Sequence, residues 1–203
     1  MEKRKASNAV NNPPPPVVSS SSKKGAPPDQ PPPIQRIKII SMGTGGCGKS
    51  CMIKRYCEDR FVSKYIATIG VDYGAKPVKI DGCDVRVNFW DLSGHPEFFD
   101  IRNEFYKDAQ GCVLVFDVSS RESFEDCDNW LAEAAKFGIN PREIPIAVCA
   151  NKIDKKRVVS EQEGRDYAQG RGFLYYEVSA ATGQNIMEMF DLLFQNVYRR
   201  VKS

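Results

Sequence analysis

The chain has 203 residues, of which 41% are hydrophobic and 27% charged, so it is long enough for one domain with a substantial core. All of the net charge of +3 is carried by residues 1–33, and the rest of the chain is neutral. A neutral body argues against nucleic-acid binding, because that function needs a concentrated basic face.

The cysteines are odd in number and show no Cys-x-x-Cys spacing. The sequence shows neither a signal peptide nor an apolar run long enough to cross a bilayer. These features predict reduced, mostly structural thiols and a cytoplasmic protein. The cysteines are Cys47, Cys51, Cys57, Cys83, Cys112, Cys127 and Cys149.

Residues 1–33 contain the runs Pro13–Pro16, Ser19–Ser22 and Pro31–Pro33 and almost no large apolar side chain. Such a stretch buries too little surface to offset the entropy of ordering, so we expect a disordered arm with polyproline II character. A solvated tail is the simplest role for it, and a ligand for SH3 or WW domains is the alternative.

From residue 34 onward, apolar segments alternate with helical patterns, which predicts one α/β domain over residues 34–203. Its sheet should be six-stranded and mostly parallel, with about five flanking helices. Asp81-Gly82 is a hairpin signal, so the strands on either side of it should form an antiparallel edge. Strands are predicted at 36–41, 76–80, 85–90, 111–117, 144–151 and 173–177, and helices at 49–58, 123–136, 161–169 and 186–201.

The last predicted helix carries an apolar face at helical spacing. We expect this face to cover the sheet, with a partner-binding stripe as the alternative. Its members are Ile186, Met189, Phe190, Leu193, Phe194, Val197 and Val201.

The stretch Gly43-Thr44-Gly45-Gly46-Cys47-Gly48-Lys49-Ser50 follows the first strand and matches a phosphate-binding loop. Its glycines let backbone N–H groups converge on phosphates, and the following helix adds the positive end of its dipole. Lys49 can bridge the outer phosphates and Ser50 can ligate Mg²⁺. Cys47 is expected to contribute its backbone N–H rather than its thiol. A glycine-rich turn before a helix is the alternative interpretation.

Asn151-Lys152-Ile153-Asp154 follows the fifth strand. The Asp154 carboxylate can accept two hydrogen bonds from guanine, a donor pair that adenine lacks, although the same four residues also form an ordinary polar turn. The run Glu177-Val178-Ser179-Ala180 ends the sixth strand, where backbone N–H groups of Ser179 and Ala180 could reach the guanine O6.

With these motifs in order, residues 34–203 resemble a small GTPase of the Ras superfamily, on its Rab side, which implies the G-domain fold of P-loop NTPases. The first switch is represented by Arg60-Phe61 and Thr68–Tyr73, and the second begins with Trp90-Asp91-Leu92-Ser93-Gly94. Arg55–Glu58, Gly94-His95-Pro96 and Arg102–Asp108 resemble the Rab-and-DnaJ family most. Many of its members carry a C-terminal J domain that this sequence lacks, so chaperone-linked roles are not expected.

The resemblance implies a set of site residues around GTP or GDP and Mg²⁺. Thr68 would ligate Mg²⁺ and touch the γ-phosphate, Asp91 would hold the metal through water, and the Gly94 N–H would approach the γ-phosphate. Phe61 would pack on guanine and Tyr65 would close over the phosphates, unless they are a core residue and a surface aromatic. Cys51 completes the predicted nucleotide-binding set, and the predicted catalytic set is Lys49, Thr68, Gly94 and His95.

His95, the single histidine of the chain, stands where Ras-like enzymes usually carry a water-orienting glutamine. Imidazole separates its donor and acceptor on a rigid ring, so we expect slow GTP hydrolysis. A general base and a neutral surface residue are the alternatives. Because Gly45 has no side chain to block an arginine finger, we expect that a partner could still activate turnover.

Segments 59–73 and 91–106 should present different surfaces in the two nucleotide states. Tyr73, Trp90 and Phe105 resemble the aromatic triad through which Rab proteins meet effectors. The expected role is signal transduction or vesicle traffic as a monomer. Without a terminal cysteine for prenylation, and with Glu2 in place of a myristoylated glycine, any recruitment to membranes or basal bodies would depend on partners.

Two other functions remain open at this point: a GTP-loaded scaffold that hydrolyses almost nothing, and a different P-loop enzyme such as an ATPase or nucleotide kinase. Asp154 argues against the second, because it selects guanine.

Overall fold

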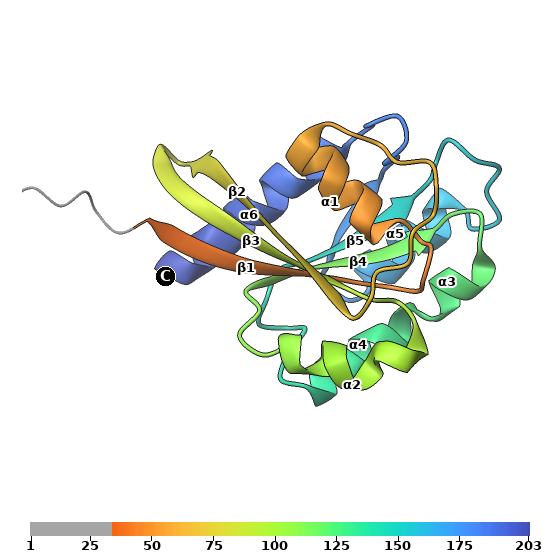
Figure 1. The fold of residues 1–203 in the computed structure, drawn as a ribbon, viewed down its shortest axis with the longest axis horizontal. Helices are drawn as coiled ribbons and strands as arrows, with labels where there is room; N and C mark the ends of the chain where they lie inside the picture. Colours follow the sequence, from red (N-terminus) through yellow and green to blue (C-terminus); the bar gives the residue numbers. More distant parts are fainter. Residues whose placement is uncertain (1–33) are drawn as a thin grey trace, which may run out of the picture. The chain divides into compact units, whose positions relative to one another are not determined.

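The computed structural model describes residues 34–203, so the predicted disordered arm of residues 1–33 lies outside the described residues (Figure 1). Six strands form one sheet in the order β2-β3-β1-β4-β5-β6. β2 and β3 are antiparallel and all other neighbours are parallel. The strands are β1 (Gln35–Met42), β2 (Val71–Ile80), β3 (Cys83–Leu92), β4 (Gly111–Asp117), β5 (Ile146–Asn151) and β6 (Leu174–Glu177).

Helices cover both faces of this sheet (Figure 1). α1 (Lys49–Glu58) and α6 (Ile186–Lys202) pack on one face, where Val113 and Val115 of β4 point. The other face, with Cys112, Leu114 and Phe116 of the same strand, is covered by the remaining helices. Because side chains alternate along a strand, the fully buried β4 contributes side chains to the hydrophobic core on each face of the sheet. The covering helices are α2 (Phe99–Arg102), α3 (Arg121–Glu125), α4 (Cys127–Lys136) and α5 (Glu161–Gln169).

The predicted α/β fold with its mostly parallel sheet is confirmed, and so is the antiparallel hairpin. Asp81 (φ 49°) and Gly82 (φ 77°) both lie in the left-handed region that a two-residue hairpin turn requires. β2 begins at Val71 rather than at 76, because it pairs with β3 along its full length, from Val71 opposite Leu92 onward.

Two helix predictions need correction. The helix expected at 123–136 is two segments, α3 and α4, with Asp126 between them. On α6 the predicted face is core as expected, except that Val201 is 38% exposed, and Tyr198, which was not predicted, is buried in the core. The second-switch region also holds two short 3₁₀ turns, Pro96–Phe98 and Asn103–Phe105, that no periodicity predicts.

The parallel strands end at one edge of the sheet, and the loops that follow β1, β3, β5 and β6 carry the predicted motifs. Ligands of open α/β sheets bind at this edge. No helix among residues 34–203 is long and apolar enough to cross a membrane.

Candidate nucleotide-binding site

A cavity of about 460 Å³ lies at this edge and gathers all the predicted motifs. Most predicted site residues line it; Gly43, Thr44, Cys47, Asp91 and Ser179 do not. Asp91 instead lines an adjoining cavity that shares Ser50. The predicted residues in the main lining are Gly45, Gly46, Gly48, Lys49, Ser50, Cys51, Phe61, Tyr65, Thr68, Gly94, His95, Asn151, Lys152, Asp154 and Ala180.

The phosphate loop requires glycine at two close approaches. Gly43 has φ 140°, and a Cβ there would lie 2.2 Å from the Val115 carbonyl oxygen. Gly48 has φ 104°, and a Cβ there would lie 2.2 Å from Nδ2 of Asn151. Any side chain at either position would therefore force backbone or motif residues apart.

The buried Lys49 ammonium curls back onto the loop, donating hydrogen bonds to the carbonyl oxygens of Gly43 (2.6 Å) and Thr44 (3.2 Å). The positive charge is thus held inside the loop that would surround phosphates. The Cys47 thiol is buried, which raises its pKa, and its backbone N–H donates to Thr44 at 3.3 Å.

Three oxygen ligands predicted for Mg²⁺ meet beside this loop. Ser50 Oγ donates to Asp91 Oδ2 and lies 3.0 Å from Thr68 Oγ1, while Ser41 Oγ donates to Asp91 Oδ1 at 2.6 Å. Burial raises the pKa of Asp91, and Lys49 and the two serine hydroxyls oppose that rise. Two hydroxyls and one carboxylate suit Mg²⁺, which takes few protein ligands and prefers oxygen.

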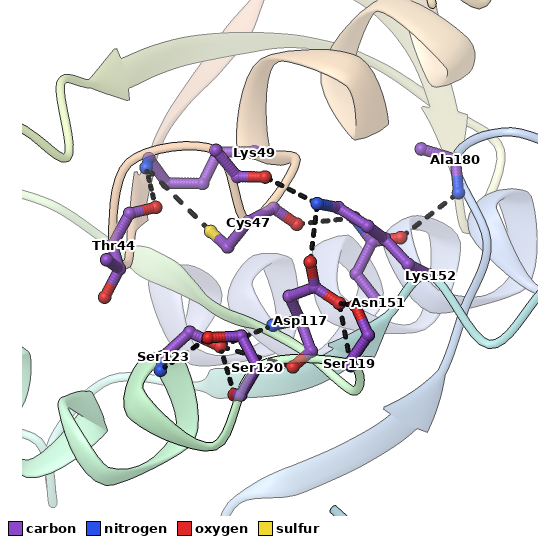
Figure 2. A network of polar contacts seen from close by, with 11 residues as sticks. Thr44, Cys47, Lys49, Asp117, Ser119, Ser120, Ser123, Asn151, Lys152 and Ala180 are labelled. Carbon is purple, nitrogen blue, oxygen red and sulfur yellow. Dashed lines mark hydrogen bonds and ion pairs between the residues drawn. The ribbon is translucent and has the colours of Figure 1, made fainter. Parts of the chain in front are cut away.

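At the base-binding end, Asn151 joins three segments (Figure 2). Its Nδ2 donates to the Cys47 carbonyl at 2.9 Å, and its Oδ1 accepts from the Ala180 N–H at 3.2 Å. Asp154 lines the cavity and accepts from Ser179 Oγ at 2.5 Å, so Ser179 orients the carboxylate from behind. The N–H groups of Ser179 and Ala180 are hydrogen-bonded within the protein, to Gln184 and Asn151.

Asp117 belongs to this network, although sequence reasoning missed it (Figure 2). Lys152 Nζ donates to Asp117 Oδ2 at 2.6 Å and to the Gly46 carbonyl at 2.7 Å. Burial raises the pKa of Asp117, but the hydrogen bonds from Lys152 and Ser119 outweigh burial and hold it below its ordinary value. The available signal was an acidic residue ending an apolar strand at the ligand-binding edge.

The loop from Asp59 to Gly70, which belongs to the first switch, contains neither helix nor strand. Phe61 is 39% exposed and lines the cavity, so the alternative of a core residue is wrong. Tyr65 is 60% exposed, lines the cavity, and its hydroxyl lies 2.7 Å from His95 Nε2.

The predicted aromatic triad forms a continuous group. Tyr73 and Trp90 have ring centroids 4.9 Å apart, and Trp90 and Phe105 have centroids 5.0 Å apart. Tyr73 is exposed while the other two rings are half-buried, so the triad forms a surface between β2, β3 and the second switch.

The backbone of His95 is fixed by two hydrogen bonds. Its N–H donates to Ser93 Oγ at 3.3 Å, and its carbonyl accepts from Arg102 Nη1 at 2.7 Å. Arg102 is nearly buried and pairs in a bidentate manner with Glu133 of α4, at 2.6 and 2.7 Å. Sequence reasoning missed this pair, because its partners lie 31 residues apart without a motif.

The space above Gly45 is not open. A Cβ at Gly45 would lie 3.1 Å from His95 Nε2, so the imidazole covers the loop where an arginine finger was expected to enter. A Cβ on the neighbouring Gly94 would lie 2.3 Å from the Gly45 nitrogen, which places the start of the second switch directly against the phosphate loop.

Comparison with known proteins agrees with this geometry. Residues 38–199 match the sequence profile of the Ras family. The chain is 54% identical over 168 residues to DnaJ homolog subfamily C member 27 of Rattus norvegicus and 53% identical over 168 residues to that of Homo sapiens. The relative from Danio rerio is 52% identical over 167 residues. Each match covers 80% of this chain and 61% of the relative, so the chain spans about three fifths of the length of these proteins.

Proposed function

The chain belongs to the Ras family, and from that membership we propose that it is a Rab-like, Mg²⁺-dependent GTP switch that hydrolyses GTP slowly. The observation that carries the proposal is the single cavity in which Lys49, Thr68 and Asp154 come together. These residues belong to the phosphate loop, the first switch and the guanine motif, and all face one volume large enough for a nucleotide.

In this proposal each end of the cavity has a separate task. Lys49 and the loop N–H groups bind the phosphates, and Ser50, Thr68 and Asp91 hold Mg²⁺, which neutralises phosphate charge when bound. Asp154, oriented by Ser179, selects guanine over adenine. The Gly94 N–H and Thr68 bind the γ-phosphate, so its loss on hydrolysis releases both switches.

Slow hydrolysis follows from His95. Water orientation in this class needs an acceptor and a donor presented together, and imidazole carries them on opposite sides of a rigid ring. Its Nε2 is also engaged with the Tyr65 hydroxyl. We therefore propose that His95 positions the attacking water poorly and that the GTP state is long-lived.

The test is single-turnover hydrolysis of preloaded GTP with Mg²⁺ in the native chain and in His95→Gln. The proposal expects the variant to be faster by about tenfold or more, since orientation by one side chain contributes that order. Equal and appreciable rates would show that His95 is accommodated in catalysis and would overturn the claim of a slow switch.

A nearly inactive GTP-bound scaffold is the second candidate, and the engaged Nε2 of His95 favours it. Multiple-turnover phosphate release separates the two functions, because a scaffold would release no phosphate beyond background. Competition between GTP and ATP for the cavity tests the guanine assignment independently, and displacement of GTP by equimolar ATP would refute it.

Effectors and regulators are proposed to bind through segments 59–73 and 91–106. The group Tyr73, Trp90 and Phe105 supports this, because aromatic side chains on a partly exposed face are typical anchors of protein interfaces.

A further inference from the structure

One face of the sheet is open to solvent at the end where β1, β2 and β3 project. β4 begins opposite Ile39, so the first residues of β1 and the residues of β3 beside them extend beyond it (Figure 1). α1 and α6 pack on one face of these strands, where Ile37 and Val87 are buried. On the opposite face, Arg36 and Arg86 are exposed.

Cations and aromatic rings follow one another along this open face. Arg36 of β1 and Arg86 of β3 are cross-strand neighbours. Lys38 comes next on the same face of β1, and its ammonium lies 5.5 Å from the Trp90 ring centroid. Trp90 in turn stands opposite Tyr73 of β2, with the ring centroids 4.9 Å apart. The three cations, here called the basic stripe, are therefore continuous with two aromatic rings.

The two arginines of the basic stripe lack a counter-charge within residues 34–203, since no carboxylate in that range lies within ion-pair distance of either. Asp84, an acidic residue of the same face, is paired with Lys79 at 3.1 Å. Lys38 differs, because Asp108 opposes the lowering of its pKa by burial. Like charges directly opposite each other on neighbouring strands destabilise a sheet, so an external anion would relieve the repulsion between the arginines.

We propose that this face binds an acidic, extended segment of a partner protein. Its carboxylates pair with the two arginines, and an apolar side chain packs on the rings of Tyr73 and Trp90. A guanidinium matches a carboxylate in a bidentate manner, and aromatic rings are typical anchors of protein interfaces. The arginines lie outside both switch segments, so this binding goes beyond the proposed switching function, and its charged part is the same with either nucleotide.

The geometry of the strands sets the spacing within the bound segment. Residues on one face of an extended chain are about 7 Å apart, in this sheet and in the partner alike. A segment running along β1 and β3 therefore meets the arginines first, then Lys38, and then Trp90 about 13 Å from the start. The expected pattern is acid-x-acid-x-apolar, with every second side chain turned toward the sheet.

The basic stripe suits a protein better than the other large polyanions. Nucleic-acid binding needs a more concentrated basic face, and residues 34–203 carry no net charge. Recognition of an anionic membrane takes clusters of about four to eight basic residues, more than the three cations of the stripe.

The test measures binding of a fluorescein-labelled peptide, Gly-Glu-Ser-Glu-Ser-Trp-Gly, to the full chain by fluorescence anisotropy, with Mg²⁺ and excess GDP. The double variant Arg36→Gln with Arg86→Gln should weaken binding by roughly three- to thirtyfold, the range of two exposed ion pairs. The matched control is Arg165→Gln with Arg171→Gln. It removes the same charge at arginines that already have acidic partners, Glu161 and Asp128, and should bind as the native chain does.

Two further peptides test the charge and the spacing. Gly-Gln-Ser-Gln-Ser-Trp-Gly has no carboxylate side chain, so its binding should be weaker and should not depend on the two arginines. Gly-Glu-Glu-Ser-Ser-Trp-Gly has the composition of the first peptide with adjacent acids. It should bind more weakly than the first peptide, because one glutamate then faces away from the sheet.

A second readout distinguishes a binding site from a structural role. Because the two arginines repel each other, Arg86→Gln should leave the Tm of the free protein unchanged or raise it. Saturating acidic peptide should raise the Tm of the native chain more than that of the double variant. A Tm lowered by Arg86→Gln would show that this arginine supports the fold, and would overturn the proposed site.

The remaining outcomes also decide between interpretations. Equal binding of the acidic peptide to the native chain and the double variant, or an equal loss in the control, would overturn the site. Arginine-dependent binding to vesicles of equal parts phosphatidylserine and phosphatidylcholine, without binding of the peptide, would show that this face recognises lipid and would overturn a protein partner. Failure to retain GDP would refute the proposed function alone, since the arginines do not line the nucleotide cavity.

Discussion

Removing the carboxylate of Glu133 should destabilise the domain strongly, because it leaves a nearly buried guanidinium without its counter-charge. The side chains of Arg102 and Glu133 are 6% and 13% exposed, and two hydrogen bonds of 2.6 and 2.7 Å join them. The Tyr106 hydroxyl also donates to Glu133 at 2.7 Å, so it loses its acceptor too. Breaking a buried pair from one side costs about 3–5 kcal/mol.

That cost is a large part of the 5–15 kcal/mol by which domains are typically stable, so Glu133→Ala should still fold but unfold at a lower urea concentration. Urea unfolding with saturating GDP and Mg²⁺ measures the change in this midpoint. The paired variant Arg102→Met with Glu133→Leu removes both charges, and should recover most of the loss because it leaves no buried charge unpaired.

The paired variant also separates stability from positioning. It restores the core but leaves the His95 carbonyl without its Arg102 donor, so nucleotide release should stay faster than native. A cost below about 1 kcal/mol for Glu133→Ala, the value of an exposed pair, would refute the reasoning that α4 anchors the second switch through a buried ion pair.

Three further predictions concern the loops and the surface. Gly94→Ala should weaken GTP affinity by about tenfold or more in equilibrium titration. The added Cβ would lie 2.3 Å from the Gly45 nitrogen, and overpacking of this kind costs about 1–3 kcal/mol. A variant with native affinity would show that the phosphate loop can shift to accommodate the methyl group. Asp154→Asn should reduce the preference for GTP over ATP by about tenfold or more, since a charge-assisted hydrogen bond is lost; an unchanged preference would remove Asp154 from base recognition. Hydrogen bonds from Arg121 and the Ser160 cap lower the pKa of Glu163 to about 2, so its contribution to stability is complete above its ordinary value of 4.5 and lost as pH falls toward 2. The Tm of Glu163→Gln should therefore fall less steeply than the native Tm between pH 4.5 and 2. Parallel curves of Tm against pH for the two proteins would contradict the lowered pKa of Glu163.

The sequence predicted the fold well where periodicity and motif act locally. The uniformly apolar β4 and the capped α5 begin and end at the predicted residues, the latter because Ser160 and Glu163 form a capping box at its start. The break at Asp126 was missed, because a helical pattern continues through it. Only the tertiary structure shows that its carboxylate accepts from Thr44 of the phosphate loop and from Trp130, each at 2.8 Å.

The candidate site divides in the same way. Lys49 and Asp154 line the cavity as predicted, because each stands at a fixed spacing within a contiguous motif. Asp117 and Arg102 could not, since each acts through a partner on a distant segment. The prediction of open space over Gly45 was wrong for a related reason, because His95, the residue that fills this space, comes from another loop.

One face of α4 supports both sides of the phosphate end of the cavity. Asp126, just before the helix, accepts from Thr44 of the phosphate loop, and Glu133, two turns later, fixes Arg102 and through it the His95 carbonyl. Trp130 lies between them, with the Arg102 guanidinium 4.6 Å from its ring centroid. Since residues at this spacing share a helix face, one rigid element holds both the phosphate loop and the His95 backbone.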